Sequence, residues 1–414
     1  MDAPHYRWVV LAVGTAAQAA TAAYFLGLAA VTPALRGYFA LDLAGVGLLI
    51  ATISAGLIPT LIPWGAAADR FGERGVMTIG LLGSAAALGG TSLVRDPVIA
   101  GALLMLAGAS GASVNAASGR AVLTWFPVRS RGFAMAVRQT SVPLGAALAA
   151  VGLPVVARAG GVPAVFAALA LTCLLGACAV AVAIREPPGG PAHRVRPSGR
   201  ARDVLSDRRL QRLSVAGLLL VVPQFLGSVF LVEILHEGGG MSLGTAGALL
   251  ALTQLLAAAG RLGNGVWSDR VGRLRPLRIV AVVVAVGFTV SAVLQPGPVA
   301  VLAVVLVPAA ALAVSWNGLV FTAAGELAPP GRAATAMAVS NTANYVGAAA
   351  TPVVGGLVVQ ALGWPAMLAL GAVAALAAVT TLHRLAEPGD GQNVTPAMPR
   401  RTPGRRRGTV SPGH

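Results

Sequence analysis

Long apolar runs separated by short polar segments fill most of this chain. A helix that crosses the hydrocarbon core of a bilayer needs about 20 consecutive apolar residues. Twelve runs reach or approach this length, so the pattern predicts an all-α membrane protein with twelve transmembrane helices. The predicted spans are residues 8–30, 45–68, 76–94, 97–121, 132–156, 163–184, 211–235, 244–267, 277–294, 298–324, 333–360 and 364–382.

Two polar segments divide the chain into parts. One segment, rich in Pro, Gly and Arg, follows the sixth span. The other follows the last span and is too polar to fold alone. The sequence therefore predicts an N-terminal six-helix bundle at 1–185, a cytoplasmic Arg/Pro/Gly-rich linker at 186–210, a C-terminal six-helix bundle at 211–384 and a disordered cytoplasmic tail at 385–414.

Arginines collect in the loops on one side of the predicted spans. That side holds Arg7, Arg70, Arg74, Arg129, Arg131, Arg270, Arg273, Arg275, Arg278, Arg332 and the arginines of the linker and tail. The other side holds only Arg36, Arg95 and Arg158. Short cytoplasmic loops of membrane proteins carry an excess of basic residues. We therefore expect a multi-pass protein of the plasma (inner) membrane with both termini in the cytoplasm.

Composition agrees with lipid as the main solvent. Charged residues make up 11% of the chain, whereas a soluble domain has about 25%. The net charge of +16 could indicate nucleic acid, but the arginines flank apolar runs and form no basic face. We expect the lipid bilayer as a partner, no nucleic acid, and a monomer. Cys173 and Cys178 share one apolar run and offer no disulfide framework or metal site, and we expect no cofactor.

A charged turn between the second and third spans recurs in the second half of the chain. Its first copy runs from Gly65 to Arg74 and its second begins at Gly265, 200 residues later. Asn115 and Asn317, and Gly145 and Gly347, are matched at an offset of 202 residues. The halves are therefore predicted to form two pseudo-symmetric bundles related by an axis along the membrane normal.

The turn resembles the signature loop of the major facilitator superfamily, whose pattern reads G-x-x-x-D-R-x-G-R-R. The first copy departs from it at Glu73 and the second at Leu274. The resemblance implies a transporter whose halves rock around a central cavity. It also implies that Asp69 faces the start of the eleventh span, beside Arg332, and the repeat then brings Asp269 near Arg129 and Arg131. The expected gating residues are Gly65, Asp69, Arg70, Gly72, Arg74, Gly265, Asp269, Arg270, Gly272, Arg273 and Arg332.

Three arginines fall inside or near the ends of apolar runs. A charge at such a position is costly and usually faces a cavity. Arg261 resembles the helix-eight arginine that clamps the substrate in nitrate and organic-anion branches of the superfamily, although Leu61 replaces the second arginine of the nitrate branch. Arg138 is a second candidate anion ligand, and Arg120 is expected to extend toward the headgroups. A structural role for Arg261, pairing with backbone carbonyls, is the alternative.

Further polar residues lie within the predicted spans. The candidate substrate-binding residues, besides Arg138 and Arg261, are Gln18, Tyr24, Asn115, Gln139, Asn317, Asn341 and Asn344, with Gln224 as another polar position. Each could instead form a hydrogen bond between helices. An intramembrane carboxylate would mark a proton relay, and the weak candidate for this coupling role is Glu233, near the outer end of the seventh span.

The sequence contains no constellation of catalytic residues, so we do not expect an enzyme. The favoured function is secondary active transport of a small solute, an organic anion, by alternating access. One alternative is efflux of hydrophobic compounds by the same fold, although the glycine-rich motif of drug antiporters is missing from the fifth span. Another alternative is a non-transporting membrane sensor.

Overall fold

The computed structural model of the protein describes residues 3–185 and 201–385, and these residues form helices and no strands. The first half contains α1 (Ala3–Gly27), the 3₁₀ turn η1 (Leu28–Val31), α2 (Thr32–Phe39), α3 (Leu43–Phe71), α4 (Glu73–Thr91), α5 (Pro97–Trp125), the 3₁₀ turn η2 (Val128–Ser130), α6 (Arg131–Gln139) and α7 (Ser141–Ala183). The second half contains α8 (Ala201–Ser206), α9 (Arg208–Val229), α10 (Leu231–His236), α11 (Leu243–Val271), α12 (Leu274–Leu294), α13 (Val299–Val314), α14 (Asn317–Leu327) and α15 (Ala333–His383).

The helices give the predicted twelve crossings. Nine helical stretches in the described chain are long and apolar enough to span a membrane. Two of them, Val128–Ala183 and Ala333–His383, are each two crossings joined by a sharp reversal at Gly161 and Gly363. The shorter α4, which begins with the charged Glu73, supplies the remaining crossing. The expected all-α membrane fold of two pseudo-symmetric bundles is thus confirmed.

The two reversals use glycine because the backbone there takes positive φ, at +70° in Gly161 and +83° in Gly363. A side chain with a Cβ is strained in this region, and glycine is not. These glycines are 202 residues apart, so the repeat extends to the loops. The predicted tail after Leu385 and much of the predicted linker lie outside the described residues, and α8 lies within the linker range.

Three predicted spans are interrupted rather than continuous. The span at 132–156 is divided at Thr140 into α6 and α7, the span at 211–235 at Phe230 into α9 and α10, and the span at 298–324 at Ser315–Trp316 into α13 and α14. Irregular backbone at membrane depth is tolerated where it is buried in protein or lines a cavity. The third break places Asn317 at the first residue of α14, within the bundle.

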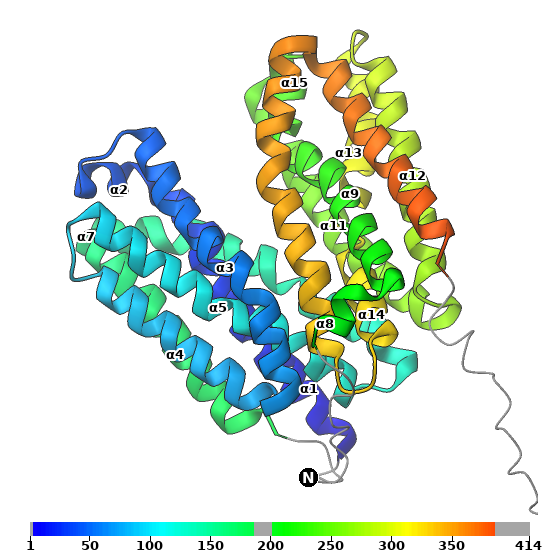
Figure 1. The fold of residues 1–414 in the computed structure, drawn as a ribbon. Coiled ribbons are helices and arrows are strands. Elements are labelled where there is room, and N and C mark those ends of the chain that lie inside the picture. The colour runs from blue at the N-terminus through cyan, green and yellow to red at the C-terminus, as the bar shows by residue number, and fades with distance from the viewer. Residues whose placement is uncertain (1–2, 186–200, 386–414) are drawn as a thin grey trace, which may run out of the picture.

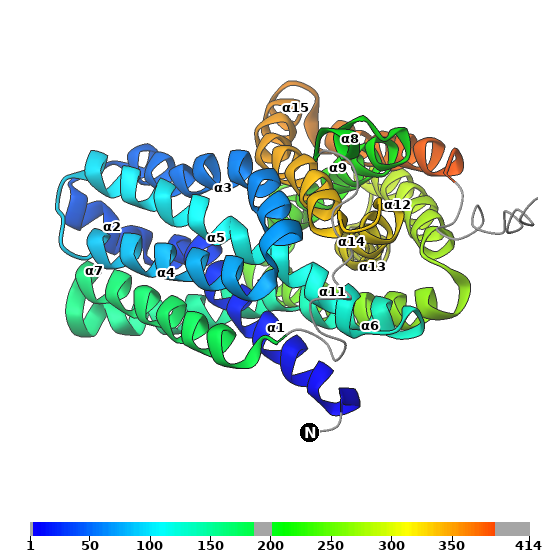
Figure 2. The same ribbon diagram turned by 60° about the horizontal axis from the view of Figure 1, so that its bottom comes forward.

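The two halves form separate bundles that meet at one end. Figure 1 shows α1–α5 and α7 as one group of helices and α9–α15 as another, converging near α1 and α8 and diverging toward the opposite end, whereas α6 of the first half packs on the second group. Viewed from the converging end in Figure 2, α6 lies beside α11, and the start of α15 lies beside α3. Each half has its own large apolar core, one centred on residues such as Phe166 and the other on residues such as Phe288.

Apolar side chains cover the outside of the bundles. Leu48 on α3 is 73% exposed, Val151 on α7 is 76% exposed and Val304 on α13 is 74% exposed. A contiguous apolar surface of this extent is unfavourable in water and is expected for helices that contact acyl chains. Because lipid gives helices no hydrophobic reason to associate, close packing through small residues must hold each bundle together.

The contact of α3 with α5 depends on such small residues. A Cβ added to Gly108 would lie 2.0 Å from the carbonyl oxygen of Ile53, and one added to Gly56 would lie 1.9 Å from that of Met105. These distances are shorter than any non-bonded contact, so the two backbones can approach only because both positions are glycine.

Replacing Gly108 with Val should therefore force α3 and α5 apart. We expect a loss of roughly 1–3 kcal/mol, the usual cost of overpacking a close contact, measured as a lower melting temperature of the purified protein in detergent. Gly47→Ala on the same helix pair is the control, because no atom lies within 4 Å of a Cβ added there. An unchanged melting temperature for Gly108→Val would contradict the packing described.

Candidate functional site

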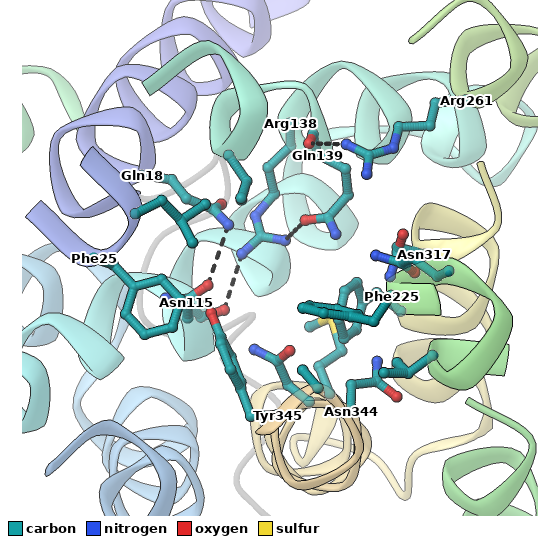
Figure 3. Close-up of a pocket in the computed structure, with 18 residues that line it drawn as sticks. Gln18, Phe25, Asn115, Arg138, Gln139, Phe225, Arg261, Asn317, Asn344 and Tyr345 are labelled. Atoms are coloured by element: carbon teal, nitrogen blue, oxygen red, sulfur yellow. Dashed lines mark hydrogen bonds between the residues drawn. The ribbon is translucent and has the colours of Figure 1, made fainter. Parts of the chain in front are cut away.

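A cavity of about 140 Å³ lies between the two bundles. Its lining comes from both halves and is drawn in Figure 3. The polar and aromatic residues around it include Gln18, Phe25, Asn115, Arg138, Gln139, Gln224, Phe225, Arg261, Asn317, Phe321, Asn341, Asn344 and Tyr345. None of the described residues that line it is Asp or Glu. The cavity therefore contains two cationic side chains and no anionic one.

Arg138 on α6 is held against the wall of this cavity by hydrogen bonds within the first half. Its Nε donates to the hydroxyl of Ser118 at 2.9 Å, its Nη1 to Oε1 of Gln139 at 2.7 Å, and its Nη2 to the backbone carbonyl of Asn115 at 2.9 Å. The residue is 3% exposed. Neutral oxygens thus orient the guanidinium without neutralising its charge.

Arg261 on α11 connects the two halves. Its Nε donates to the carbonyl of Val314 at 3.0 Å, and its Nη1 donates to the carbonyl of Gln139, in the opposite half, at 2.8 Å. Its Nη2 makes no hydrogen bond to any described residue. Arg261 therefore pairs with backbone carbonyls, as the structural alternative expects, and also lines the cavity, and its role as a substrate ligand stays a prediction.

The other polar residues differ between the halves. In the first half, Gln18 donates to Oδ1 of Asn115 at 3.2 Å and accepts from Ser118 at 3.5 Å, which closes a network with Arg138. In the second half, several buried amide atoms have no hydrogen-bond partner among the described residues. They are Oε1 of Gln224, Oδ1 of Asn317, and both Oδ1 and Nδ2 of Asn344.

Two predicted site residues lie away from the cavity. Tyr24 is 1% exposed and donates to the carbonyl of Ala107 at 3.0 Å, so it joins α1 to α5 instead of lining the main cavity. Glu233 is exposed on α10 and does not line the cavity either. The sequence position of Glu233 could not predict that it lies outside the cavity, because the helix is interrupted at Phe230 and Glu233 belongs to the separate helix α10.

The expected contact of Asp69 with the start of the eleventh span is present. Its carboxylate accepts hydrogen bonds from the backbone N–H groups of Ala334 at 3.0 Å and Thr335 at 2.9 Å, and from the hydroxyl of Thr335 at 2.6 Å. Unpaired N–H groups at a helix N-terminus favour an anion. Gly65, one turn earlier on α3, leaves room for this approach, since a Cβ there would lie 2.8 Å from the carbonyl oxygen of Ala334.

The repeat-related contact forms between α11 and α6. Asp269 accepts from the N–H groups of Gly132 at 2.8 Å and Phe133 at 2.9 Å. Gly265 again permits the close approach, because a Cβ there would lie 2.7 Å from the carbonyl oxygen of Gly132. We call these two contacts the aspartate latches, and the end of the molecule where they lie the latch end.

Each latch has its own ion pairs, and the position after the second glycine of the turn is acidic in one copy and basic in the other. In the first, Arg120 on α5 lies 3.5 Å from Asp69 and 3.0 Å from Glu73. In the second, Arg273 lies 2.7 Å from Asp269 and 3.2 Å from Glu326 on α14. Glu73 and Arg273 are equivalent in the repeat, so the turn supplies the anion in one half and the cation in the other.

The second network also crosses between the halves. Arg131, at the start of α6, lies 3.8 Å from Glu326, and Nη2 of Arg273 donates to the carbonyl of Val128 at 2.7 Å. Burial alone would lower the pKa of Arg273, but the ion pairs with Glu326 and Asp269 outweigh burial and raise that pKa. Arg273 therefore stays charged at any physiological pH.

Several sequence expectations for the latch end need correction. Arg120 does not extend to the headgroups, because it pairs with Asp69 and Glu73. Arg120 is a cation that lies at Asp69, and Arg332 lies at the N-cap position of α15. Three predicted gating residues, Arg70, Arg74 and Arg270, are exposed. Gly72 and Gly272 end α3 and α11 with φ of +85° and +90°.

The sequence reasoning missed two groups of residues. It did not include Arg120 and Glu73 in the gate, although the departure of Glu73 from the repeat pattern was a usable signal. It also missed Ser118, which receives the Nε–H of Arg138. A serine in a small-residue helix gives no pattern that would single it out.

Comparisons with known proteins agree with this architecture. The family model described as Major Facilitator Superfamily matches residues 12–352. A relative from Mycobacterium tuberculosis (strain ATCC 25618 / H37Rv), described as an uncharacterized MFS-type transporter, is 34% identical over 388 residues, covering 92% of this chain and 86% of the relative.

Two solved structures illustrate the likeness in fold. The E. coli fucose:proton symporter FucP has a TM-score of 0.73 at 16% identity and covers 90% of this chain and 97% of its own. The human organic anion transporter MFSD10 has a TM-score of 0.73 at 19% identity and covers 91% of this chain and 99% of its own. At these identities the likeness concerns the fold alone.

The ion pair between Glu73 and Arg120 can be tested by reversing the charges of its two members, so that the turn of the first latch carries a cation as the turn of the second latch does. Glu73→Arg alone places two cations together, and Arg120→Glu alone places three anions together, so each should lower the melting temperature. The double variant restores opposite charges and should recover part of the loss, with a coupling of roughly 0.5–3 kcal/mol in a double-mutant cycle. Glu237→Arg, at an exposed position, is the control. Additive losses in the double variant would show that the pair is not coupled.

Proposed function

This chain belongs to the Major Facilitator Superfamily, and on that premise we propose that it transports a small organic anion across the plasma membrane by alternating access. Members of this family are membrane transporters that bind small-molecule substrates between their halves. The observation that carries the proposal is the pair of arginines, Arg138 and Arg261, in a cavity whose described lining has no carboxylate.

Electrostatics favour an anion at this position. A buried charge is costly unless another charge or several hydrogen bonds compensate for it. Arg138 and Arg261 are held by neutral oxygens and, for Arg138, the sulfur of Met135, so the charge of the cavity remains positive. An anion that enters would lower this cost, and a cation would raise it. The unpaired Nη2 group of Arg261 provides donors for a carboxylate.

Efflux of hydrophobic compounds is the second candidate function, because Phe25, Phe225 and Phe321 also line the cavity. The cavity volume of about 140 Å³ counts against it, since sites for drug-sized molecules commonly measure about 300–1,000 Å³. The two buried arginines would also have no role in binding a neutral or cationic drug. The sensor alternative depended on the linker and tail, most of which lie outside the described residues.

The aspartate latches support a gating role for Asp69 and Asp269. Each carboxylate holds the start of a helix from the opposite half, and both act at the same end of the molecule. The arginine bias of the loops at that end favours assigning it to the cytoplasm. In the proposed cycle the latches stabilise the state closed to the cytoplasm, and opening that side requires both to break. Cargo shifts the equilibrium toward the state open to the cytoplasm only if it binds that state more tightly.

The lining of the cavity also bears on coupling. No described Asp or Glu lines the cavity. If a second anion binds the arginines while the transporter returns to its first state, the cycle needs no side chain that gains or loses a proton. Anion exchange is therefore the simplest form of the proposal, and we propose that a monomer suffices because both halves of the cavity come from one chain.

Arg261→Gln should reduce anion uptake into proteoliposomes at least tenfold, since it removes the donors that face the cargo. Arg138→Gln should reduce uptake as well, measured with the same panel of radiolabelled carboxylates, namely lactate, hexanoate and gluconate. Arg95→Gln is the matched control, because Arg95 stacks over Tyr38 at the far end of the molecule. Unchanged uptake in both cavity variants, or transport of ethidium in place of any carboxylate, would refute the anion proposal.

The latches can be tested by hydrogen exchange. Asp69→Asn should speed exchange at the start of α15, and Asp269→Asn should speed exchange at the start of α6, because a neutral amide accepts more weakly than a carboxylate. Asp96→Asn is the control, since Asp96 caps α5 through Val98 and Ile99 within one half. If hydrogen exchange at the starts of α6 and α15 stays as slow in the variants as in the parent protein, the aspartates do not hold these helix starts.

A further inference from the structure

We propose that the transported anion is a hydroxylated carboxylate of the sugar-acid type. This inference rests on the proposed function and adds to it the chemistry of the neutral part of the cargo. The carboxylate would lie at Arg138 and Arg261, and the hydroxyl groups would bind amides supplied by α9, α14 and α15 of the second half.

The unpaired amide atoms are concentrated on one side of the cavity. Gln224, Asn317 and Asn344 all line it, and each has at least one buried amide atom without a partner among the described residues. Asn344 is 6% exposed, and neither its Oδ1 nor its Nδ2 is paired. A buried polar atom left without a hydrogen bond costs about 1–3 kcal/mol. These atoms are packed against neighbouring helices, with Oδ1 of Asn344 beside Gly217 of α9, so under this proposal the three amides turn to pair with the cargo when it binds.

Among the described cavity amides of the first half, no buried atom lacks a partner. The side-chain oxygens of Gln18, Asn115 and Gln139 each accept a hydrogen bond. In Figure 3 Arg138 and Gln139 lie on one side of the central space, and Asn344 and Tyr345 lie on the other. A cargo that spans this space would therefore meet positive charge at one end and neutral hydrogen-bonding groups at the other.

The unpaired amide atoms include both hydrogen-bond acceptors and a donor, and this combination favours hydroxyl groups on the cargo. Three of the unpaired atoms are carbonyl oxygens, which accept hydrogen bonds, and one is an NH₂ group, which donates. A hydroxyl group can both donate and accept, so it satisfies any orientation of these amides. An ammonium group could also donate, but two nearby arginines and a lining without carboxylates oppose a second cation. A simple fatty acid would leave every amide unpaired.

The test compares three probes of similar length with purified protein in a thermal-shift titration. Gluconate carries both the carboxylate and the hydroxyls, hexanoate carries only the carboxylate, and glucose carries only the hydroxyls. Binding to the folded state raises the melting temperature, and the stabilisation grows with the logarithm of one plus the ratio of ligand concentration to Kd. We expect gluconate to act at a concentration at least tenfold below that of hexanoate, and glucose to give no shift.

Variants then show which residues bind the carboxylate of the cargo and which bind its hydroxyl groups. Asn344→Leu and Gln224→Met keep side-chain volume and remove the amide, so each should weaken gluconate binding about tenfold and leave hexanoate unchanged. Arg261→Gln should weaken both acids. Should Asn344→Leu fail to fold, as judged by its ligand-free melting temperature, Gln224→Met serves as the independent variant.

The outcomes separate this inference from the proposed function. Equal binding of hexanoate and gluconate, both weakened by Arg261→Gln, would overturn the hydroxylated cargo and keep the anion transporter. Binding of glucose as strong as that of gluconate, with no effect of Arg261→Gln, would overturn the proposed function itself. No shift with gluconate while hexanoate binds, or no shift with any probe, would also overturn the sugar-acid assignment.

Discussion

Each half of this protein holds the start of a helix from the other half through one aspartate carboxylate. Asp69 binds the N–H groups that begin α15, and Asp269 binds those that begin α6. The remaining architecture depends on these two contacts. They fix which end of the bundles converges, and they require glycine at Gly65 and Gly265 so that the backbones can approach. The cavity lies between the halves, which meet at the latch end and diverge toward the opposite end.

The two latches show how a duplicated chain can keep a geometry while exchanging the charges that support it. The turn offers an anion at Glu73 in one half and a cation at Arg273 in the other, and the complementary charge comes from α5 or α14. Both arrangements leave the aspartate with a cationic neighbour. In both latches a cation lies close to the aspartate and to a second acidic residue, but different helices supply these charges.

The cavity is asymmetric for a related reason. The first half contributes Arg138 within a closed hydrogen-bond network, and the second half contributes Arg261 and amides that are unpaired among the described residues. Arg261 donates to the carbonyl of Gln139 across the boundary between halves. Movement of one half relative to the other would therefore change the hydrogen bonds of an arginine in the cavity. Such a link would allow the state of the cavity and the relative position of the bundles to affect each other.

The sequence alone determined the number of crossings, the duplication and the positions of the two aspartates, because span length, the offset between copies and the charged turn are local properties of the chain. It also identified Arg138, Arg261, Asn115, Asn317 and Asn344, since polar residues in apolar runs stand out. Only the tertiary structure decided which groups each side chain meets. Tyr24 bonds to α5, Glu233 lies exposed on α10, and Arg120 pairs with acids from α3 and α4. Such pairings depend on how helices distant in the chain rotate and approach one another, and hydrophobic periodicity does not specify that rotation when small residues cover every face of a helix.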